Sequence, residues 1–340
     1  MTDLAERMLG ALIGAVELCT VELGRKLGLY AALRDGPLTP AELAKAAGID
    51  ERYAREWLEQ QAAAGFLTPS FELTPDVASV LLDEGGPDYA GAAAEFAVGV
   101  ALLTPRVIEA FRTGEGVPYS EYADVRHGIA GFNRPMFDHL LTTEWLPAVP
   151  EVDALLRSGS GAAVLDLGCG MGYSSVALAV AYPSITVRGV DLDPDSIAAA
   201  RSVAAAAGVA DRVSFAVGDA AGALSGSYDL VTIFEALHDM GDPVGVLRAA
   251  RGVLAPGGSV FIADERVADT FTAPAGEVER LQYAFSVLHC LPATRAENPV
   301  IANGTILRAP TLLGWARDAG FGSPSVLDIE NEFWRFYRLR

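Results

Sequence analysis

The sequence predicts an α/β domain with a doubly wound parallel sheet, preceded by an all-helical domain that contains a winged helix. From about Ala162 onward, short β-branched runs alternate with alanine-rich helical stretches, a pattern typical of a parallel sheet with crossover helices. The first of these runs leads into three glycines in the segment VLDLGCGMG. The preceding residues carry helical patterns only. We therefore expect a helical domain over residues 1–155 and the α/β domain over residues 156–340.

Each expected strand of the α/β domain is a short apolar run followed by turn residues. The expected strands are 163–167, 185–190, 213–217, 228–233 and 259–263. The expected helices are 173–181, 195–207, 243–254 and 311–319. The chain closes with SVLDIE and EFWRFYRL, whose alternating patterns predict two further strands.

Residues 21–75 carry the pattern of a winged helix. In LTPAELAKAAG, Thr39 stands three residues before Glu42, which predicts a capping box at a helix start. In IDERYAREWLEQQAAAG, Asp50 is expected to cap a second helix, and FLTPSFELTP then predicts a short hairpin-like wing.

The charge balance argues against a nucleic-acid partner. The chain has 44 acidic and 25 basic residues, a net charge of −19, and no concentrated basic patch. Because nucleic acids carry dense negative charge, we expect no binding to them. The three cysteines are far apart and form no CxxC pair, so we expect no disulfide framework, no metal site and a cytoplasmic location.

The N-terminal segment is apolar but does not fit a signal peptide or a membrane span. It lacks a basic leader, and Asp3, Glu6, Glu17 and Glu22 interrupt its apolar run. We expect an amphipathic helix there that packs on a partner subunit, which predicts a homodimer through the N-terminal domain.

The glycine segment predicts a nucleoside-binding turn. A strand runs into Gly168, Gly170 and Gly172, and a helix with free N–H donors follows. Asp191 lies 19 residues after Gly172, near the end of the second strand, where an acid accepts hydrogen bonds from ribose hydroxyls. The glycines alternate at every second position and no GxxxxGK[ST] motif is present, so neither a dinucleotide fingerprint nor a P-loop is matched.

The successive motifs VLDLGCGMG, GVDLDP, FAVGDA, YDLVTIFEALHD and LAPGG resemble those of class I S-adenosylmethionine-dependent methyltransferases, whose sheet is Rossmann-like. The resemblance implies S-adenosylmethionine as cofactor and S-adenosylhomocysteine as product. It also implies roles for eight residues. The methionine portion would lie on Gly168 and Gly170, the ribose on Asp191, and the adenine on Leu192, Asp219 and Ala220, with Asp166 and Phe234 as further cofactor contacts. A second interpretation keeps Asp166 as a structural carboxylate satisfied by backbone N–H groups.

His238, in FEALHDMGDP, follows the fourth strand at the cofactor-facing edge of the sheet. The segment resembles the His-Asp-Trp motif of winged-helix small-molecule O-methyltransferases of the plant caffeic-acid and bacterial polyketide types, in which the histidine is the general base. Asp264 or Glu265 would steer its ring. The motif's Trp is Met240 here, and Arg308 stands where the family has a second carboxylate. A structural histidine, or one that only orients the acceptor, is the alternative.

The acceptor pocket is predicted from two further segments. FNRPMFDH resembles the FNxxMxxH segment of the same family, which implies acceptor contacts from Phe132, Met136 and His139. The insertion 276–303 would form a lid with Tyr283 and His289 facing the acceptor, or would simply add to the core.

These features predict a methyltransferase that acts on a hydroxyl of a small molecule, and by analogy with the resembling enzymes we expect a substrate from secondary metabolism. One alternative is a winged-helix transcriptional regulator with S-adenosylmethionine as effector, although its recognition helix has a net charge of −1. Another is an enzyme of this fold with N-, C- or non-methylating chemistry.

Overall fold

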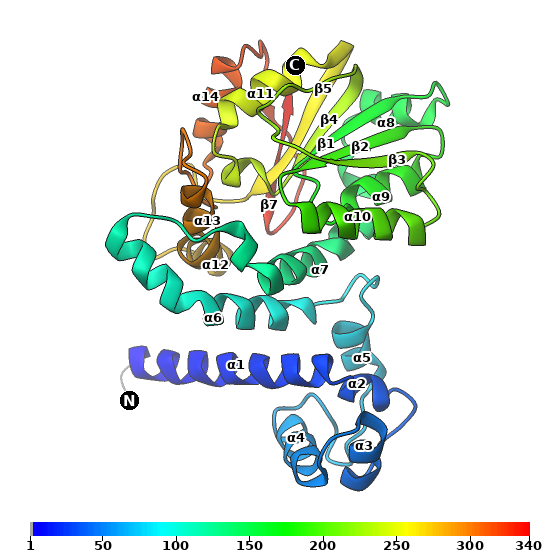
Figure 1. The fold of residues 1–340 in the computed structure, drawn as a ribbon, viewed down its shortest axis with the longest axis vertical. Coiled ribbons are helices and arrows are strands. Elements are labelled where there is room, and N and C mark those ends of the chain that lie inside the picture. Colours follow the sequence, from blue (N-terminus) through cyan, green and yellow to red (C-terminus); the bar gives the residue numbers. More distant parts are fainter. Residues whose placement is uncertain (1–2) are drawn as a thin grey trace. The chain divides into compact units, whose positions relative to one another are not determined.

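The computed structural model describes residues 3–340, and the chain packs into two units (Figure 1). The first unit comprises the chain through Leu102 together with Tyr122–Met136, and the second comprises Leu103–Glu121 together with Phe137–Arg340. This division groups residues by packing and not by role, so the functional boundary near residue 155 stays a prediction.

The first unit is helical wherever the structure assigns regular elements. Its helices are α1 (Asp3–Lys26), α2 (Leu29–Ala32), α3 (Pro40–Ala47), α4 (Glu51–Ala63), α5 (Pro75–Leu82) and parts of α6 (Ala92–Thr113) and α7 (Ala123–His139). The expected caps are confirmed: Thr39 and Glu42 form a capping box at α3, and the Asp50 side chain accepts from the first backbone N–H groups of α4. Its core packs the edge of Tyr30 on Trp57, with ring centroids 5.0 Å apart.

The predicted wing forms a tight turn and not a paired hairpin. The Thr68 N–H donates to the Glu72 carbonyl at 3.0 Å, but no strand is assigned between residues 66 and 74. Pro69 lacks an N–H donor, and Phe71 adopts a left-handed φ of 65°. These two residues replace strand pairing with a closed turn.

The second unit contains a seven-stranded sheet in the order β3-β2-β1-β4-β5-β7-β6. The strands are β1 (Ala163–Leu167), β2 (Thr186–Asp191), β3 (Val213–Val217), β4 (Tyr228–Phe234), β5 (Leu254–Glu265), β6 (Ser325–Val326) and β7 (Trp334–Leu339). The pairs among β1 to β5 are parallel, whereas β7 runs antiparallel to both β5 and β6. The doubly wound sheet is therefore confirmed, with every expected strand present.

Strand β5 begins five residues earlier than the sequence predicts. Tyr228 pairs with Leu254, and the register then shifts before Leu230 pairs with Ser259. Pro256-Gly257-Gly258, whose residue types favour a turn, lie inside this irregularity, and Gly257 has a φ of 85°. The turn residues thus form a bulge within the strand and do not end it.

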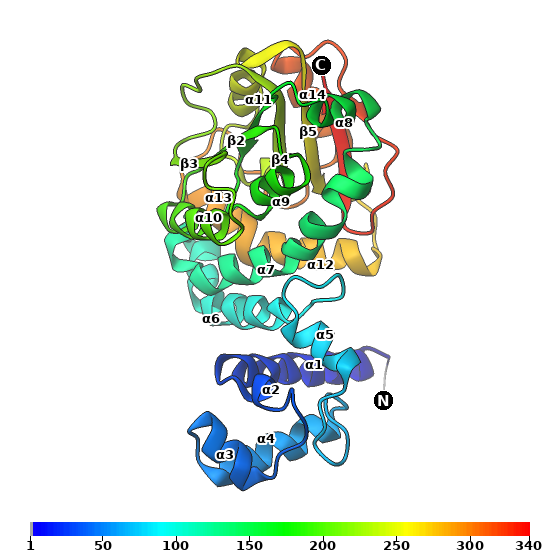
Figure 2. The ribbon, with the colours of Figure 1, turned by 90° about the vertical axis from the view of Figure 1, so that its right-hand side faces the viewer.

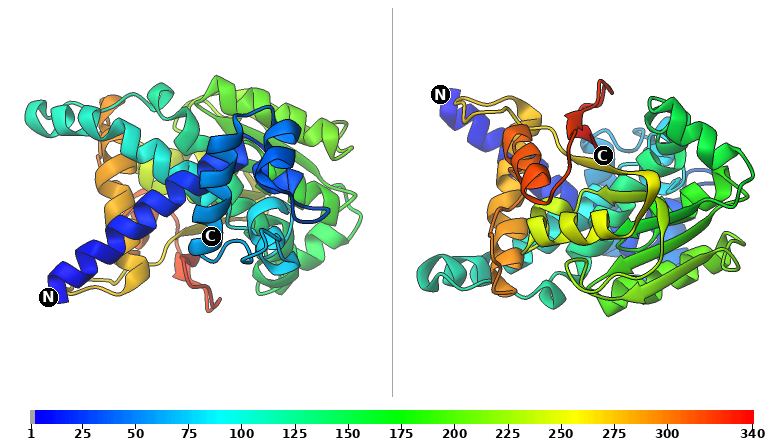
Figure 3. Two further views of the ribbon diagram at one scale, coloured as in Figure 1. Left: turned by 90° about the horizontal axis from the view of Figure 1, so that it is seen from below. Right: turned by 90° about the horizontal axis from the view of Figure 1, so that it is seen from above.

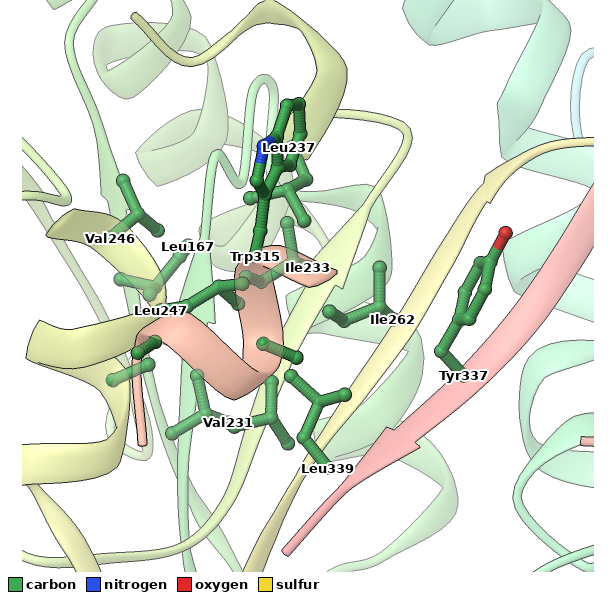
Figure 4. Close-up of a cluster of buried hydrophobic side chains, with 14 of the residues drawn as sticks. Leu167, Val231, Ile233, Leu237, Val246, Leu247, Ile262, Trp315, Tyr337 and Leu339 are labelled. Atoms are coloured by element: carbon green, nitrogen blue, oxygen red, sulfur yellow. The ribbon is translucent and has the colours of Figure 1, made fainter. Parts of the chain in front are cut away.

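Helices cover both faces of the sheet (Figure 3). One face carries α9 (Tyr173–Ala181) and α10 (Pro194–Ala206), with α8 (Pro150–Arg157) near the β1 end (Figure 2). The other carries α11 (Pro243–Gly252) and α14 (Ala309–Asp318). Leu247 and Trp315 pack from these two helices onto Val231 and Ile233 of β4 (Figure 4). This buried apolar layer fixes the strands, so their carboxyl ends form a rigid edge.

The remaining short elements lie before the sheet, directly after β4 and in the insertion between β5 and α14. They are η1 (Tyr119–Glu121), η2 (Leu141–Trp145), η3 (Leu237–Asp239), α12 (Glu277–Phe285), η4 (Ser286–Cys290) and α13 (Leu291–Ala296). Within residues 3–340, every helix falls short of the length or apolarity needed to cross a bilayer.

Candidate active site

The glycine loop after β1 has an open side. Gly168, Gly170 and Gly172 all adopt positive φ, at 69°, 49° and 79°. A Cβ on Gly168 would come within 2.6 Å of the Ala236 Cβ, and one on Gly172 within 2.7 Å of Phe215, whereas a Cβ on Gly170 would meet nothing within 4 Å. The loop is therefore packed on its flanks and open at its centre, where a ligand can approach the backbone.

Asp191, at the end of β2, holds this loop in place. Its Oδ2 accepts from the Gly170 N–H at 2.8 Å, and its Oδ1 accepts from the Asp193 N–H at 2.9 Å. The carboxylate is half-buried, and the neighbouring Leu192 exposes 53% of its surface despite being apolar. A carboxylate beside an exposed apolar side chain suits a nucleoside, whose ribose donates hydrogen bonds and whose base is flat and apolar.

Asp166 is buried inside the loop structure. Hydroxyls of Ser174, Ser175 and Thr232 donate to it at 2.6, 2.6 and 2.8 Å. Burial raises its pKa, and these three hydrogen bonds oppose the rise. Side-chain hydroxyls, and not the backbone N–H groups of the structural interpretation, satisfy this carboxylate. They tie β1 to α9 and β4, while direct contact between Asp166 and the cofactor stays a prediction.

The remaining predicted cofactor contacts lie at the same edge of the sheet. Asp219 follows β3, is exposed and accepts from the Ala221 N–H at 2.8 Å, while Ala220 is buried. Phe234 ends β4, where its ring centroid lies 5.5 Å from that of Phe137.

His238 lies in η3, just after β4, and is paired with a buried carboxylate. Its Nδ1 lies 2.8 Å from Asp264 Oδ1, and because a carboxylate only accepts, the ring nitrogen donates. The Glu265 N–H donates to the same oxygen at 2.9 Å. Both His238 and Asp264 are buried. Burial by itself lowers the pKa of His238, but the carboxylates of Asp264 and Asp239 outweigh it and raise that pKa well above its usual value.

Glu235 is a site residue that the sequence reasoning missed. It follows β4 directly, adopts a left-handed φ of 48°, and its carboxyl hydrogen-bonds that of Glu265 at the end of β5. Gln282 of α12 donates to Glu265 Oε2 at 2.5 Å. Burial raises the pKa of Glu265 to about 7 and that of Glu235 well above its usual value, and the two carboxyls titrate as a pair. The signal was present in the sequence, because Glu235 is an acid at the carboxyl end of a buried strand.

The insertion supplies a second histidine near His238. Cys290 hydrogen-bonds His238, and its Sγ lies 3.4 Å from the Nδ1 of His289. Burial lowers the pKa of His289 to about 4, so it is neutral. The Tyr283 hydroxyl accepts from Arg308 at 2.7 Å.

The three predicted acceptor contacts before the sheet are divided between the two units. Phe132 and Met136 belong to the first unit, whereas His139 belongs to the second. All three are half-buried. Their contacts with an acceptor stay predictions, as do those of Tyr283 and His289.

One group of side chains could offer ligand atoms to a metal. Potential ligand atoms of His238, Asp239 and Cys290 lie within 4.8 Å of one another. Burial raises the pKa of the Cys290 thiol to about 12, so a metal would have to displace its proton. The expectation of no metal site stays a prediction.

Comparison with known proteins places this geometry in a family. Residues 158–298 match the model of a methyltransferase domain, and residues 14–73 match that of an Rv2258c-like winged HTH domain. A ubiquinone biosynthesis O-methyltransferase of Xanthomonas axonopodis pv. citri is 30% identical over 182 residues, which is 52% of this chain and 69% of that protein. One from Pseudomonas paraeruginosa is 30% identical over 54% of this chain and 75% of its own length.

Two solved structures share the fold along the whole chain. An O-methyltransferase family protein from Burkholderia thailandensis has a TM-score of 0.74 at 21% identity, covering 100% of this chain and 98% of its own. Human N-acetylserotonin methyltransferase in complex with SAM has a TM-score of 0.69 at 16% identity, with coverages of 100% and 98%. The open centre at Gly170, the Asp191 carboxylate and the exposed Leu192 fit S-adenosylmethionine, which is the cofactor. The chain belongs to the S-adenosylmethionine-dependent methyltransferases and carries an N-terminal winged helix-turn-helix domain.

Proposed function

We propose that this enzyme methylates a hydroxyl group of a small molecule and that His238 is the general base. The observation that carries the proposal is the 2.8 Å hydrogen bond from His238 Nδ1 to Asp264, because it fixes the ring and leaves Nε2, 3.5 Å from Asp239 Oδ1, as the nitrogen that would exchange the proton once it is deprotonated. S-adenosylmethionine supplies, when bound, a methyl group activated by a positively charged sulfur. The protein's own task is then to orient the acceptor, exclude water and remove the hydroxyl proton.

The protonation state of His238 sets the pH dependence of this function. Because the pKa of His238 is raised well above its usual value, the ring keeps its proton to higher pH than an ordinary histidine does. A positive charge brought close to the ring lowers that pKa by like-charge repulsion. The proposal therefore expects the rate to rise with pH as His238 loses its proton, and expects cofactor binding to move that rise to lower pH.

Apolar packing around the base supports a site that excludes water. Phe137, Phe234 and Trp334 form a buried aromatic cluster at the ends of β4 and β7, with Trp145 packed against it. Proton transfer and charge stabilisation are more effective in such a low-dielectric environment. An acceptor with an apolar ring system, such as a secondary metabolite, suits these surroundings, with Phe132, Met136, His139, Tyr283 and His289 as its proposed contacts.

Helix α1 supports a homodimer. It exposes a run of large apolar side chains, with Leu4, Met8 and Leu12 each more than 59% exposed. An exposed apolar stripe of this size is typical of a protein–protein interface. We propose that a second copy covers it in a cytoplasmic dimer.

The alternative of a DNA-binding regulator has less support. On α4, Arg52 forms an ion pair with Glu56, and Arg55 lies 3.7 Å from Glu51. These pairs neutralise the positive charge that a recognition helix would offer to phosphates. A gel-shift assay with genomic fragments at physiological salt tests this alternative, and a sequence-specific shift would favour it.

The test of the base is His238→Ala, with His127→Ala as its control. His127 is exposed, and its Nδ1 lies 2.9 Å from the Ala123 carbonyl, remote in sequence from the proposed chemistry. With radiolabelled S-adenosylmethionine and a panel of phenols, His238→Ala is expected to lose ~10²-fold or more in turnover while keeping its cofactor affinity. Unchanged turnover would exclude His238 as the base.

A further inference from the structure

The carboxyl pair of Glu235 and Glu265 has no part in the proton transfer proposed above. Glu265 is buried, Glu235 is half-buried, and the two carboxyls hydrogen-bond each other. Bringing two carboxyls together away from water is costly, and the left-handed φ of 48° at Glu235 adds backbone strain. Unfavourable arrangements of this kind are typical of functional positions. A bound ligand of positive charge would stabilise the two carboxyls.

Within residues 3–340, two buried oxygen atoms on neighbouring residues also lack hydrogen-bond donors. Asp264 Oδ2 and Gln282 Oε1 are buried without a hydrogen-bond partner among the described residues, and their residues are 0% and 2% exposed. Asp264 adjoins Glu265 in β5, and Gln282 donates to Glu265 through its other amide atom. Both atoms are acceptors. The ligand that satisfies them must bring positive charge or donor hydrogens, and an anionic one would be repelled.

The pair lies beside the glycine loop. Gly168 is packed so closely on Ala236 that a Cβ there would come within 2.6 Å of the Ala236 Cβ. Ala236 is the residue after Glu235, and His238 follows two residues later. Along the chain, Glu235 therefore directly precedes the residue that packs on the loop proposed to hold the methionine portion, and the proposed base follows shortly after.

We propose that the Glu235–Glu265 pair recognises the positive charge of the sulfonium and so distinguishes the cofactor from its neutral thioether product. The inference rests on the proposed placement of the methionine portion at Gly168. The pair therefore favours the charged cofactor over the neutral product, because the electrostatic attraction is lost when the methyl group leaves. The pair's contribution to binding is then lost on methyl transfer without any movement of the protein.

The test compares three ligands by calorimetry: S-adenosylmethionine, the cationic analogue sinefungin and neutral S-adenosylhomocysteine. Glu235→Gln and Glu265→Gln keep the side-chain shape and a hydrogen-bond donor but cannot carry the charge. Glu277→Gln, an exposed position on α12, is the control for loss of one carboxylate elsewhere.

Each pair variant is expected to weaken binding of both cations about tenfold and to leave the affinity for S-adenosylhomocysteine within about twofold. Unchanged product affinity also shows that the variant is folded. Equal weakening of all three ligands, or no weakening of the cations, would overturn the inference. Those outcomes differ from a failure of the proposed function, in which the wild-type protein binds the cofactor but His238→Ala still turns over phenols.

Discussion

The carboxylates at the two halves of the sheet edge differ in the hydrogen-bond donors that surround them. At the β1–β2 half, Asp166 accepts from three hydroxyls and Asp191 from two backbone N–H groups. At the β4–β5 half, Glu235 pairs with Glu265, and Asp264 leaves one buried oxygen without a donor among the described residues.

We interpret the β1–β2 half as the part that binds the cofactor and the β4–β5 half as the part that carries out the reaction. Carboxylates with dedicated hydrogen-bond donors keep their geometry whether or not a ligand is bound, so the β1–β2 half is a preorganised binding site. In the β4–β5 half, two carboxyls lie against each other and Asp264 Oδ2 has no donor among the described residues, so this half responds strongly to added charge, which is what proton and methyl transfer require. Substitutions in the first half should therefore affect stability and binding, and those in the second should affect rate and pH dependence.

The largest effect is expected for Asp264→Asn. The amide can neither stabilise a positive ring nor enforce the orientation of His238, so turnover should fall by ~10²-fold or more. Removing the negative charge also lowers the pKa of His238, which moves the acid limb of the pH–rate profile to lower pH. A pH–rate series at saturating cofactor checks both effects, and an unmoved limb would separate Asp264 from His238.

Asp166→Ala is expected to reduce the stability of the fold more than it reduces cofactor binding. Ser174, Ser175 and Thr232 lose their shared acceptor inside the core, which is expected to lower the free energy of unfolding by about 2–4 kcal/mol. Denaturant titration of the variant beside wild type measures this loss. Wild-type stability together with weakened cofactor binding would instead make Asp166 a cofactor contact.

Asp191→Ala should weaken cofactor binding by ~10- to 100-fold, because the variant loses the proposed ribose acceptor and releases the Gly170 N–H. Calorimetry with Asp211→Ala, an exposed turn position, as control isolates this effect. Wild-type affinity in Asp191→Ala would refute the ribose assignment.

The smallest effect is expected for Leu192→Ala. Its exposed side chain would lose its proposed apolar contact with the adenine ring, which corresponds to about a three- to tenfold loss of affinity. Comparing S-adenosylmethionine with adenosine in the same titration shows whether the loss belongs to the base.

The sequence predicts the β1–β2 half far better than the β4–β5 half. Local chemistry fixes the glycine turns and the acid after β2, so strands, helices and the order of Gly168, Gly170 and Asp191 follow from a short stretch of chain. The pairing of His238 with Asp264 was expected only as one of two alternatives, because it joins residues 26 positions apart, one in η3 and the other in β5.

Contacts that depend on strand register or on the docking of the insertion could not be predicted from the sequence. Glu235 meets Glu265 only because β4 and β5 pair Phe234 with Ala263, and Gln282 reaches them from a helix whose docking no local pattern encodes. The wing was misjudged for a local reason, since Pro69 and Phe71 favour a closed turn over strand pairing.

The most direct test of the account is a crystal structure of the enzyme with S-adenosylhomocysteine. The account predicts the homocysteine tail against Gly168 and Gly170, the ribose on Asp191, and the thioether sulfur facing Glu235 and His238. A nucleoside bound elsewhere, or a sulfur walled off from His238 by the Phe137–Phe234 cluster, would contradict it.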